Sequence, residues 1–222
     1  MKAPFRANAI LFDLDGTLVD TAGDIGAALD ALLVENGHKA LGEATARGLV
    51  GDGARALIEK GWKVAGLPAP DAVTLDKLTA RWFQIYEADI ARNSKPYPGV
   101  EATLDALLKR GLKLGIVTNK ADRPTAKLLK ALGFEKYFGA VVGGDVPFRK
   151  PDPRHVRIGL AALGSTPGET AFVGDSPNDA YSARAAGLPF IAVPYGYSLG
   201  PVENLRADVL VRDFAQIAEL IA

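Results

Sequence analysis

Residues 9–20 have the sequence AILFDLDGTLVD, an apolar run that ends in two closely spaced aspartates. The apolar residues predict a buried strand, and the alternation of side chains along it puts Asp13 and Asp15 on the same side as it ends. Gly16 and Thr17 then allow a sharp turn that leaves both carboxylates at the edge of a sheet. Two carboxylates this close are both ionised only beside a cation, so we expect a divalent metal and a site suited to phosphoryl transfer.

The same residues have two plainer interpretations. An Asp-x-Asp-Gly sequence is common in ordinary turns, so the motif alone does not establish chemistry. A calcium-binding loop needs glycine at its sixth position and a bidentate glutamate at its twelfth. Counted from Asp13, these positions hold Leu18 and Asp24, which excludes the calcium loop.

Composition limits the classes of protein to consider. The chain has 222 residues, 48% of them hydrophobic, enough for one mid-sized domain with an insertion. Its 26 basic and 26 acidic residues cancel, so no net charge draws it to nucleic acid or to a membrane. The absence of cysteine excludes disulfides and a thiol nucleophile. With no signal peptide and no apolar run long enough to span a bilayer, we expect a cytoplasmic protein.

Short β-rich runs alternate with helical segments over most of the chain. We predict strands at residues 9–14, 113–118, 140–144, 170–174 and 190–193, with an edge strand at 208–211. We predict helices at residues 100–110, 123–132, 153–163 and 178–186. This alternation indicates an α/β fold with a Rossmann-like parallel-sheet core.

One interval breaks the alternation. Residues 21–93 show helical patterns and no strand, so we expect a helical cap domain inserted into an α/β core of residues 1–20 and 94–222. Thr21 and Asp24 have the spacing of a capping box at the start of the first cap helix. The segment SKPYPG, residues 94–99, predicts a hinge where the chain returns to the core.

Further motifs follow the other predicted strands, at the edge where ligands bind in open α/β sheets. Thr118 and Asn119 offer a hydroxyl and backbone amides suited to a phosphate. Lys150 precedes a proline that fixes its backbone, and Asp175 and Asp179 follow a later strand. Each motif alone has a structural explanation as a helix cap, a solvated lysine or an Asx turn. Their joint occurrence at strand ends indicates a phosphoryl-transfer site.

These motifs resemble the four signature motifs of the haloacid dehalogenase-like hydrolases, and the resemblance covers essentially the whole chain. They are DLDGT at 13–17, TN at 118–119, KP at 150–151 and GDS at 174–176 with Asp179. The resemblance implies that Asp13 is a nucleophile that forms an aspartyl-phosphate. Asp15 would protonate the leaving group and then activate water. Mg²⁺ would be held by the carboxylates of Asp13 and Asp175 and by the backbone carbonyl of Asp15.

The resemblance also implies a substrate-binding set. Thr118 and Lys150 would bind the phosphoryl oxygens, with Asn119 beside them, while Asp179 would orient Lys150 or a metal-bound water. The segments 94–100 and 195–197 look most like those of bacterial phosphoglycolate phosphatases. A small phosphorylated metabolite, 2-phosphoglycolate, is therefore the expected substrate, with glycolate and phosphate as products. The compact link 143–149 departs from that pattern.

Alternative functions remain open at this point. One is a phosphosugar phosphatase or mutase of the same superfamily, although mutases usually carry another residue at the position of Thr17. Another is a phospho-accepting signalling module, which would need neither Asp15 nor a cap. The sequence GDGARA, residues 51–56, matches a dinucleotide fingerprint but lacks the preceding strand. We interpret it as a cap loop near the site, with Arg55 as a candidate for a substrate carboxylate.

Two remaining features carry little functional information. His38 and His155 are the only histidines, and neither lies in a recognised catalytic or metal-ligand pattern, so we expect both at the surface. The sequence gives no indication of the oligomeric state.

Overall fold

The computed structural model describes residues 5–198 and 200–222, so the first four residues of the predicted core segment lie outside it. The described residues form a six-stranded parallel sheet in the order β5-β4-β1-β6-β7-β8. Its strands are β1 (Ala9–Phe12), β4 (Lys113–Val117), β5 (Ala140–Val142), β6 (Thr170–Gly174), β7 (Phe190–Ala192) and β8 (Val209–Leu210). The predicted α/β fold with a Rossmann-like core is confirmed.

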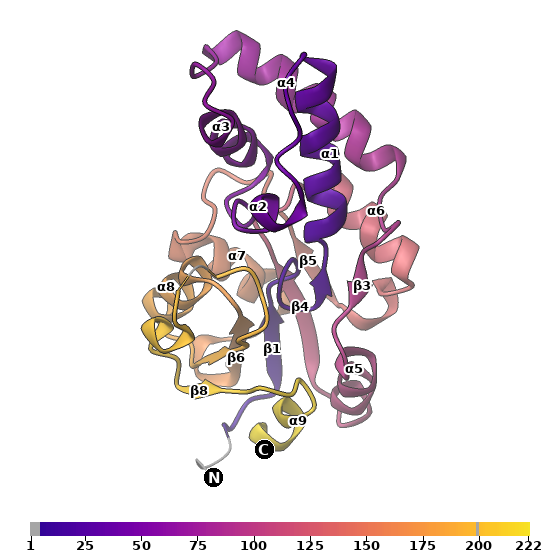
Figure 1. Ribbon diagram of the computed structural model, residues 1–222. Helices are drawn as coiled ribbons and strands as arrows, with labels where there is room; N and C mark the ends of the chain where they lie inside the picture. The colour runs from indigo at the N-terminus through magenta and orange to yellow at the C-terminus, as the bar shows by residue number, and fades with distance from the viewer. Residues whose placement is uncertain (1–4, 199) are drawn as a thin grey trace.

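Helices cover both faces of this sheet (Figure 1). The core helices are α5 (Val100–Lys109), α6 (Asp122–Leu132), α7 (Pro153–Leu163), α8 (Pro177–Ala186) and α9 (Gln216–Leu220). Residues of α5, α6 and α9 share one hydrophobic cluster with the sheet, and residues of α7 and α8 share a second. Short 3-10 turns complete the connections at Glu135–Tyr137, Pro167–Glu169 and Val202–Leu205.

Strand β1 shows why the sheet is buried on both sides. Ile10 and Phe12 belong to one hydrophobic cluster, whereas Ala9 and Leu11 belong to the other. All four side chains are fully buried, and alternation along the strand sends them to opposite faces. Burying a large apolar side chain in this way stabilises the fold by about 1.5–3 kcal/mol. The central strand is thereby fixed in register directly before Asp13.

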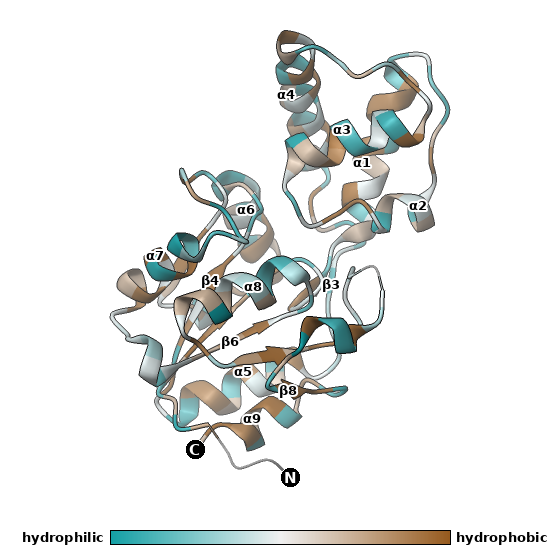
Figure 2. Cartoon of the chain, turned by 90° about the vertical axis from the view of Figure 1, so that its left-hand side faces the viewer, coloured by the Kyte–Doolittle hydropathy of each residue, from teal (hydrophilic) through white to brown (hydrophobic). Residues whose placement is uncertain are grey.

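The residues after β1 leave the sheet and form the cap, which stands as a separate group of helices in Figure 2. Its helices are α1 (Ala22–Glu35), α2 (Glu43–Arg47), α3 (Ala54–Val64) and α4 (Ala72–Ala88). Apolar side chains from different cap helices, such as Leu29 of α1, Ile58 of α3 and Leu75 of α4, form a third hydrophobic cluster inside the cap. The expected helical insertion is present, and the exact domain boundaries at residues 21 and 93 stay a prediction.

A two-stranded antiparallel ribbon carries the chain into the cap and back, with β2 (Val19–Asp20) paired to β3 (Lys95–Pro96). The capping box predicted for Thr21 and Asp24 is wrong, because both side chains have other partners. The Thr21 hydroxyl donates to Asp15 at 2.7 Å. Asp24 accepts hydrogen bonds from the backbone amides of Asn93 and Ser94 and from the Ser94 hydroxyl. Asp24 thus connects the outgoing chain to the returning one.

None of the helices within residues 5–198 and 200–222 combines the length and apolar character needed to cross a membrane.

Candidate active site

The predicted motifs meet at the carboxyl edge of three adjacent strands. Asp13 directly follows β1, Thr118 follows β4 and Asp175 follows β6, and both outer strands pair with β1. The Asp13 amide donates to Val173 at 2.9 Å, which continues the ladder one residue beyond the strand. The central strand therefore delivers Asp13 to the middle of the site.

A buried cluster of charged groups occupies this edge. Lys150 Nζ lies 2.9 Å from Asp13 Oδ1 and 2.7 Å from Asp179 Oδ1. The side chains of Lys150 and Asp179 are 1% and 0% exposed. Carboxylate oxygens of Asp13, Asp175 and Asp179 all lie within 4.8 Å of one another. Two of these three carboxylates, those of Asp13 and Asp179, therefore pair with one buried ammonium group, and Asp175 lies close to both.

This crowding shifts the proton affinities of the cluster. Burial is the main cause that raises the pKa of Asp13, with Lys150 opposing the rise and Asp179 adding to it. Burial likewise raises the pKa of Asp175, and the neighbouring Asp179 and Asp13 raise it further. Burial alone would lower the pKa of Lys150, but Asp13 and Asp179 outweigh it and raise that pKa. The excess negative charge is relieved either by protons or by a bound cation.

The positions of Asp175 and Asp179 are fixed by short hydrogen bonds. Asp175 accepts from the Thr17 hydroxyl at 2.9 Å and from the Tyr197 amide at 2.7 Å. A Cβ atom on Gly196 would lie 2.1 Å from Asp175 Oδ2, so only glycine permits this approach. Asp179 forms a capping box with Ser176 at the start of α8. The helix start thereby orients the carboxylate that binds Lys150.

Lys150 is held by its backbone as well as by its side chain. The side-chain amide of Asn119 donates to the Lys150 carbonyl at 2.9 Å. The backbone amide of Lys150 donates to His155 Nδ1 at 3.2 Å. The expectation that His155 lies at the surface is wrong, since its side chain is fully buried. Burial and the nearby Lys150 lower the pKa of His155 to about 4. The neutral ring can accept from Lys150 while its Nε2 lies 3.0 Å from the Gly143 carbonyl.

Asp15 lies outside the cluster around Lys150 and pairs with a different lysine, Lys120. Lys120 Nζ lies 3.1 and 3.2 Å from its two carboxylate oxygens, and the Thr21 hydroxyl is also bonded to it. The Lys120 and Asp15 side chains are only 5% and 12% exposed. Burial would lower the pKa of Lys120, but the charge of Asp15 outweighs it and raises that pKa. Sequence analysis missed Lys120, although its place directly after Thr118 and Asn119 was a usable signal.

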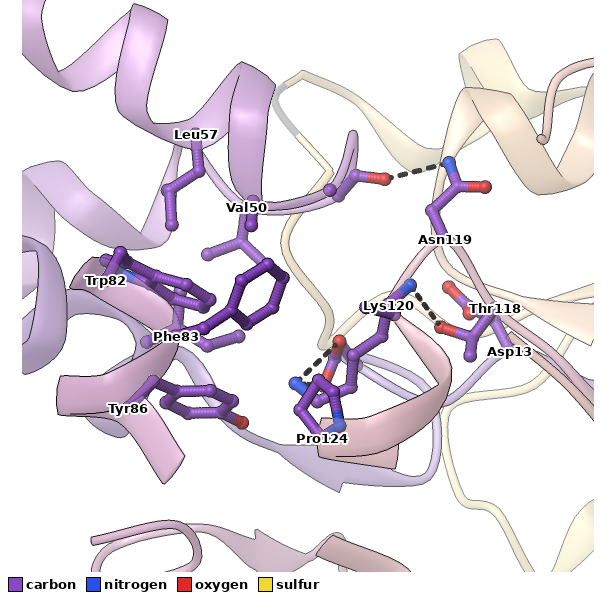
Figure 3. A pocket seen from close by; sticks show the side chains of 16 residues that line it. Asp13, Val50, Leu57, Trp82, Phe83, Tyr86, Thr118, Asn119, Lys120 and Pro124 are labelled. Carbon is purple, nitrogen blue, oxygen red and sulfur yellow. Dashed lines mark hydrogen bonds and ion pairs between the residues drawn. The ribbon is translucent and has the colours of Figure 1, made fainter. Parts of the chain in front are cut away.

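A pocket opens between this edge and the cap (Figure 3). Asp13, Asp15, Thr118, Asn119 and Lys120 line its core side. Its cap side is mostly aliphatic and aromatic, and consists of Ile25, Val50, Gly51, Gly53, Ala54, Leu57, Trp82, Phe83 and Tyr86. Asn119 Nδ2 bridges the two sides with a 3.1 Å bond to the carbonyl of Gly51. The glycine-rich loop expected near the site therefore reaches it.

Arg55 is the one predicted site residue that the structure places elsewhere. Its guanidinium forms an ion pair with Asp76, and both side chains are exposed. Arg55 is not among the residues that line the pocket, whereas its neighbour Ala54 is. The remaining predicted residues lie together at the sheet edge, in two groups centred on Lys150 and Lys120.

Comparison with known proteins identifies the family. The sequence model of the haloacid dehalogenase-like hydrolases matches residues 10–193. The chain belongs to that family. It is 43% identical over 209 residues to a phosphoglycolate phosphatase of Caulobacter vibrioides, covering 94% of this chain and 88% of the relative. It is 39% identical to a phosphoglycolate phosphatase of Agrobacterium fabrum, covering 93% and 89%.

Solved structures of haloacid dehalogenase-like hydrolases agree with this fold. A structure described as a predicted phosphoglycolate phosphatase from Haemophilus somnus superimposes with a TM-score of 0.89 at 29% identity, covering 96% of this chain and 97% of the other. The chain is therefore an enzyme of the phosphatase kind. The signalling module and the dinucleotide-binding interpretation of residues 51–56 are set aside.

The acidic cluster of this hydrolase suits a hard divalent cation. Asp13, Asp175 and Asp179 offer oxygen ligands, which Mg²⁺ prefers, and their combined charge exceeds that of Lys150. The Asp15 side chain turns instead to Thr21 and Lys120. The resemblance to the family implied that Asp15 binds the metal through its backbone carbonyl only. The orientation of its side chain is compatible with that role.

Proposed function

We propose that this phosphatase is magnesium-dependent and hydrolyses 2-phosphoglycolate to glycolate and phosphate through a covalent intermediate on Asp13. The observation that carries the proposal is the buried group of Asp13, Asp175 and Asp179, in which Asp13 and Asp179 pair with Lys150. Such a group can bind a cation and a phosphoryl group side by side. The phosphoglycolate phosphatases among the relatives support the choice of substrate.

The reaction has two steps. In the first, a carboxylate oxygen of Asp13 attacks phosphorus and the bond from phosphorus to the ester oxygen breaks. Asp15 gives its proton to that oxygen, so that glycolate leaves as the alcohol. In the second, Asp15 takes a proton from a water molecule whose oxygen attacks phosphorus. The bond to Asp13 then breaks, which releases phosphate and restores both aspartates.

The surrounding residues hold the phosphoryl group and balance its charge. Lys150, oriented by Asp179 at 2.7 Å, and the Thr118 hydroxyl would bind phosphoryl oxygens. Mg²⁺ would be held by the carboxylates of Asp13 and Asp175 and by the Asp15 carbonyl. When bound, it supplies positive charge that offsets the charge of the phosphoryl group.

The pocket wall favours a small leaving group over a sugar. Sugar hydroxyls that are buried need hydrogen-bond partners, since an unpaired one costs about 1–3 kcal/mol. The cap side of the pocket offers mainly aliphatic and aromatic groups such as Val50, Leu57 and Phe83. On entering this site, a phosphosugar would therefore lose more hydrogen bonds to water than 2-phosphoglycolate would.

Phosphate release from a panel of esters tests the proposal. The panel contains 2-phosphoglycolate, a hexose phosphate, a pentose phosphate and p-nitrophenyl phosphate, each assayed with Mg²⁺, with EDTA, and after Mg²⁺ is restored. We expect 2-phosphoglycolate to give the highest kcat/KM, with activity lost in EDTA and recovered with Mg²⁺. A higher kcat/KM for a sugar phosphate would overturn the substrate, and full activity in EDTA would overturn the role of the metal.

A further inference from the structure

Lys120 is the only positively charged side chain among the described residues that line the pocket. It belongs to the core, but its ammonium group lies under the cap, 4.6 Å from the centre of the Tyr86 ring. The whole residue is 8% exposed. A buried ammonium is costly unless anionic groups surround it. Asp15 is one such group, and the pocket leaves space for another beside it.

The position of Lys120 relative to Asp15 connects it to the leaving group. Under the proposed function, Asp15 delivers a proton to the ester oxygen, so that oxygen must lie against Asp15 during the reaction. Lys120 Nζ lies 3.1 and 3.2 Å from the two oxygens of Asp15. A group one or two bonds beyond the ester oxygen therefore comes within reach of Nζ. In 2-phosphoglycolate, that group is the carboxylate.

A second donor lies at the same end of the pocket. The Tyr86 residue is 2% exposed, and its hydroxyl makes no hydrogen bond of good geometry within residues 5–198 and 200–222. Its polar neighbour is Lys120, whose pKa it helps to raise. Figure 3 shows this hydroxyl turned toward the side chain of Lys120, which is paired with Asp15. A buried hydroxyl without a well-formed hydrogen bond is uncommon in native proteins, and a ligand acceptor placed beside it would complete it. A carboxylate has enough acceptor sites for both the ammonium and the hydroxyl.

We propose that Lys120, assisted by the Tyr86 hydroxyl, binds the carboxylate of the leaving group and makes this enzyme selective for phosphoesters of short 2-hydroxy acids. The inference rests on the proposed function. It moves the role of carboxylate recognition from Arg55, which is exposed and paired with Asp76, to a residue inside the pocket. A core lysine and a cap hydroxyl thus recognise the leaving group under a cap wall that is otherwise mainly apolar.

Paired substrates separate this role from a general effect on Asp15. 2-Phosphoglycolate and ethyl phosphate have similar size, but only the first carries a carboxylate. We expect Lys120→Met to lower kcat/KM for 2-phosphoglycolate by about 10- to 100-fold, the range for a lost hydrogen bond to a charged group. The value for ethyl phosphate should fall as well, because Asp15 loses its buried ion-pair partner. The readout is therefore the ratio of the two values, and the loss for 2-phosphoglycolate should exceed the loss for ethyl phosphate by about tenfold. Lys130→Met, on the exposed face of α6, is the matched control and should affect neither substrate.

Tyr86→Phe removes only the hydroxyl. Because this hydroxyl makes no hydrogen bond of good geometry in the protein and Lys120 keeps its ion pair with Asp15, its loss should change the melting temperature little. The KM for 2-phosphoglycolate should rise about three- to tenfold, while the KM for ethyl phosphate stays the same. A structural hydroxyl would show the opposite pattern, with lower stability and equal effects on both substrates.

A binding experiment separates failure of this inference from failure of the proposed function. Calorimetry on Asp13→Asn and on Asp13→Asn/Lys120→Met measures 2-phosphoglycolate and inorganic phosphate without requiring turnover. We expect the second substitution to weaken 2-phosphoglycolate by about 10- to 100-fold and to leave phosphate unchanged. Equal weakening of both ligands, or of both substrates in the kinetic assay, would overturn the role of Lys120 while leaving the phosphatase mechanism intact. Selective weakening without turnover in the wild type would instead overturn the proposed reaction and leave Lys120 as a carboxylate site.

Discussion

At the sheet edge, Lys150 joins Asp13 and Asp179 through ion pairs of 2.9 and 2.7 Å, whereas the facing wall of the same pocket is formed mainly by aliphatic and aromatic side chains of the cap. In the first region each carboxylate is positioned by a strand end or a helix start. The second depends on how the cap helices rest on the core. The contrast indicates that the sheet edge determines the reaction, and that the apolar cap wall and the one core cation in the pocket, Lys120, determine which ester enters.

The largest effect is expected from substituting the proposed nucleophile, Asp13, on the core side of the pocket. Asp13→Asn should reduce phosphate release from every ester by at least about a thousandfold, because an amide cannot form the covalent intermediate. The same change removes one of three crowded carboxylates, so the melting temperature in the absence of metal should rise. The measurements are single-turnover phosphate release and a thermal melt without added metal.

Asp89→Asn provides the control for this variant. Asp89 is an exposed cap residue paired with Arg92, and its loss should leave turnover unchanged. Retention of more than about a tenth of the activity by Asp13→Asn would contradict the assignment of Asp13. An equal loss for all esters would support the division between the two regions, whereas a loss that depends on the ester would weaken it.

A smaller effect concerns how the acidic cluster exchanges protons for a cation. The pKa values of Asp13 and Asp175 are raised by burial in the folded protein, so the folded state binds their protons more tightly than the unfolded chain does. Above the ordinary carboxyl range of roughly 4, the stability that these groups contribute is therefore lost as pH rises through their raised values. Mg²⁺ replaces those protons, so it should bind better as pH rises.

Thermal melts with and without Mg²⁺ measure this exchange. We expect saturating Mg²⁺ to raise the melting temperature by several degrees near about pH 8 and by much less near about pH 5.5. Asp175→Asn, which removes one proposed ligand, should abolish most of the difference. An equal rise at both pH values would mean that the buried carboxylates do not bind the cation.

The two regions also differ in how far the sequence predicted them. Asp13, Thr118, Lys150 and Asp175 each follow or precede a recognisable strand or helix signal, so local pattern was enough to bring them to one edge. Lys120 directly follows the motif Thr118-Asn119. Its two neighbours in the pocket, Asp15 and the Tyr86 ring, come from a distant turn and from a cap helix. Such contacts depend on how helices pack, and periodicity does not specify packing.

Two errors have a similar origin. Thr21 and Asp24 had the local spacing of a capping box, but each found a partner outside its own helix, in Asp15 and in the returning hinge. His155 carried no motif and was expected at the surface, yet it lies buried and accepts a hydrogen bond from the Lys150 amide. In the first case tertiary hydrogen bonds prevailed over the local pattern, and in the second the burying contact had no local pattern to announce it.

The smallest expected effect tests the pocket wall alone. Phe83 lies at the centre of the pocket in Figure 3 and packs edge-to-face on Trp82 at 5.3 Å. Phe83→Ala should enlarge the space for the leaving group without touching Asp13 or Lys150. The ratio of kcat/KM for p-nitrophenyl phosphate to that for 2-phosphoglycolate should then rise by about three- to tenfold, within the range for changed apolar contacts in a pocket.

Val64→Ala is the matched change on the same cap, at an exposed position away from the pocket. Its ratio should equal that of the wild type. If Phe83→Ala instead lowers kcat for both esters by the same factor, the cap wall takes part in the reaction as well as in selection. Phe83 would then contribute to catalysis by excluding water from Asp13 and Asp15.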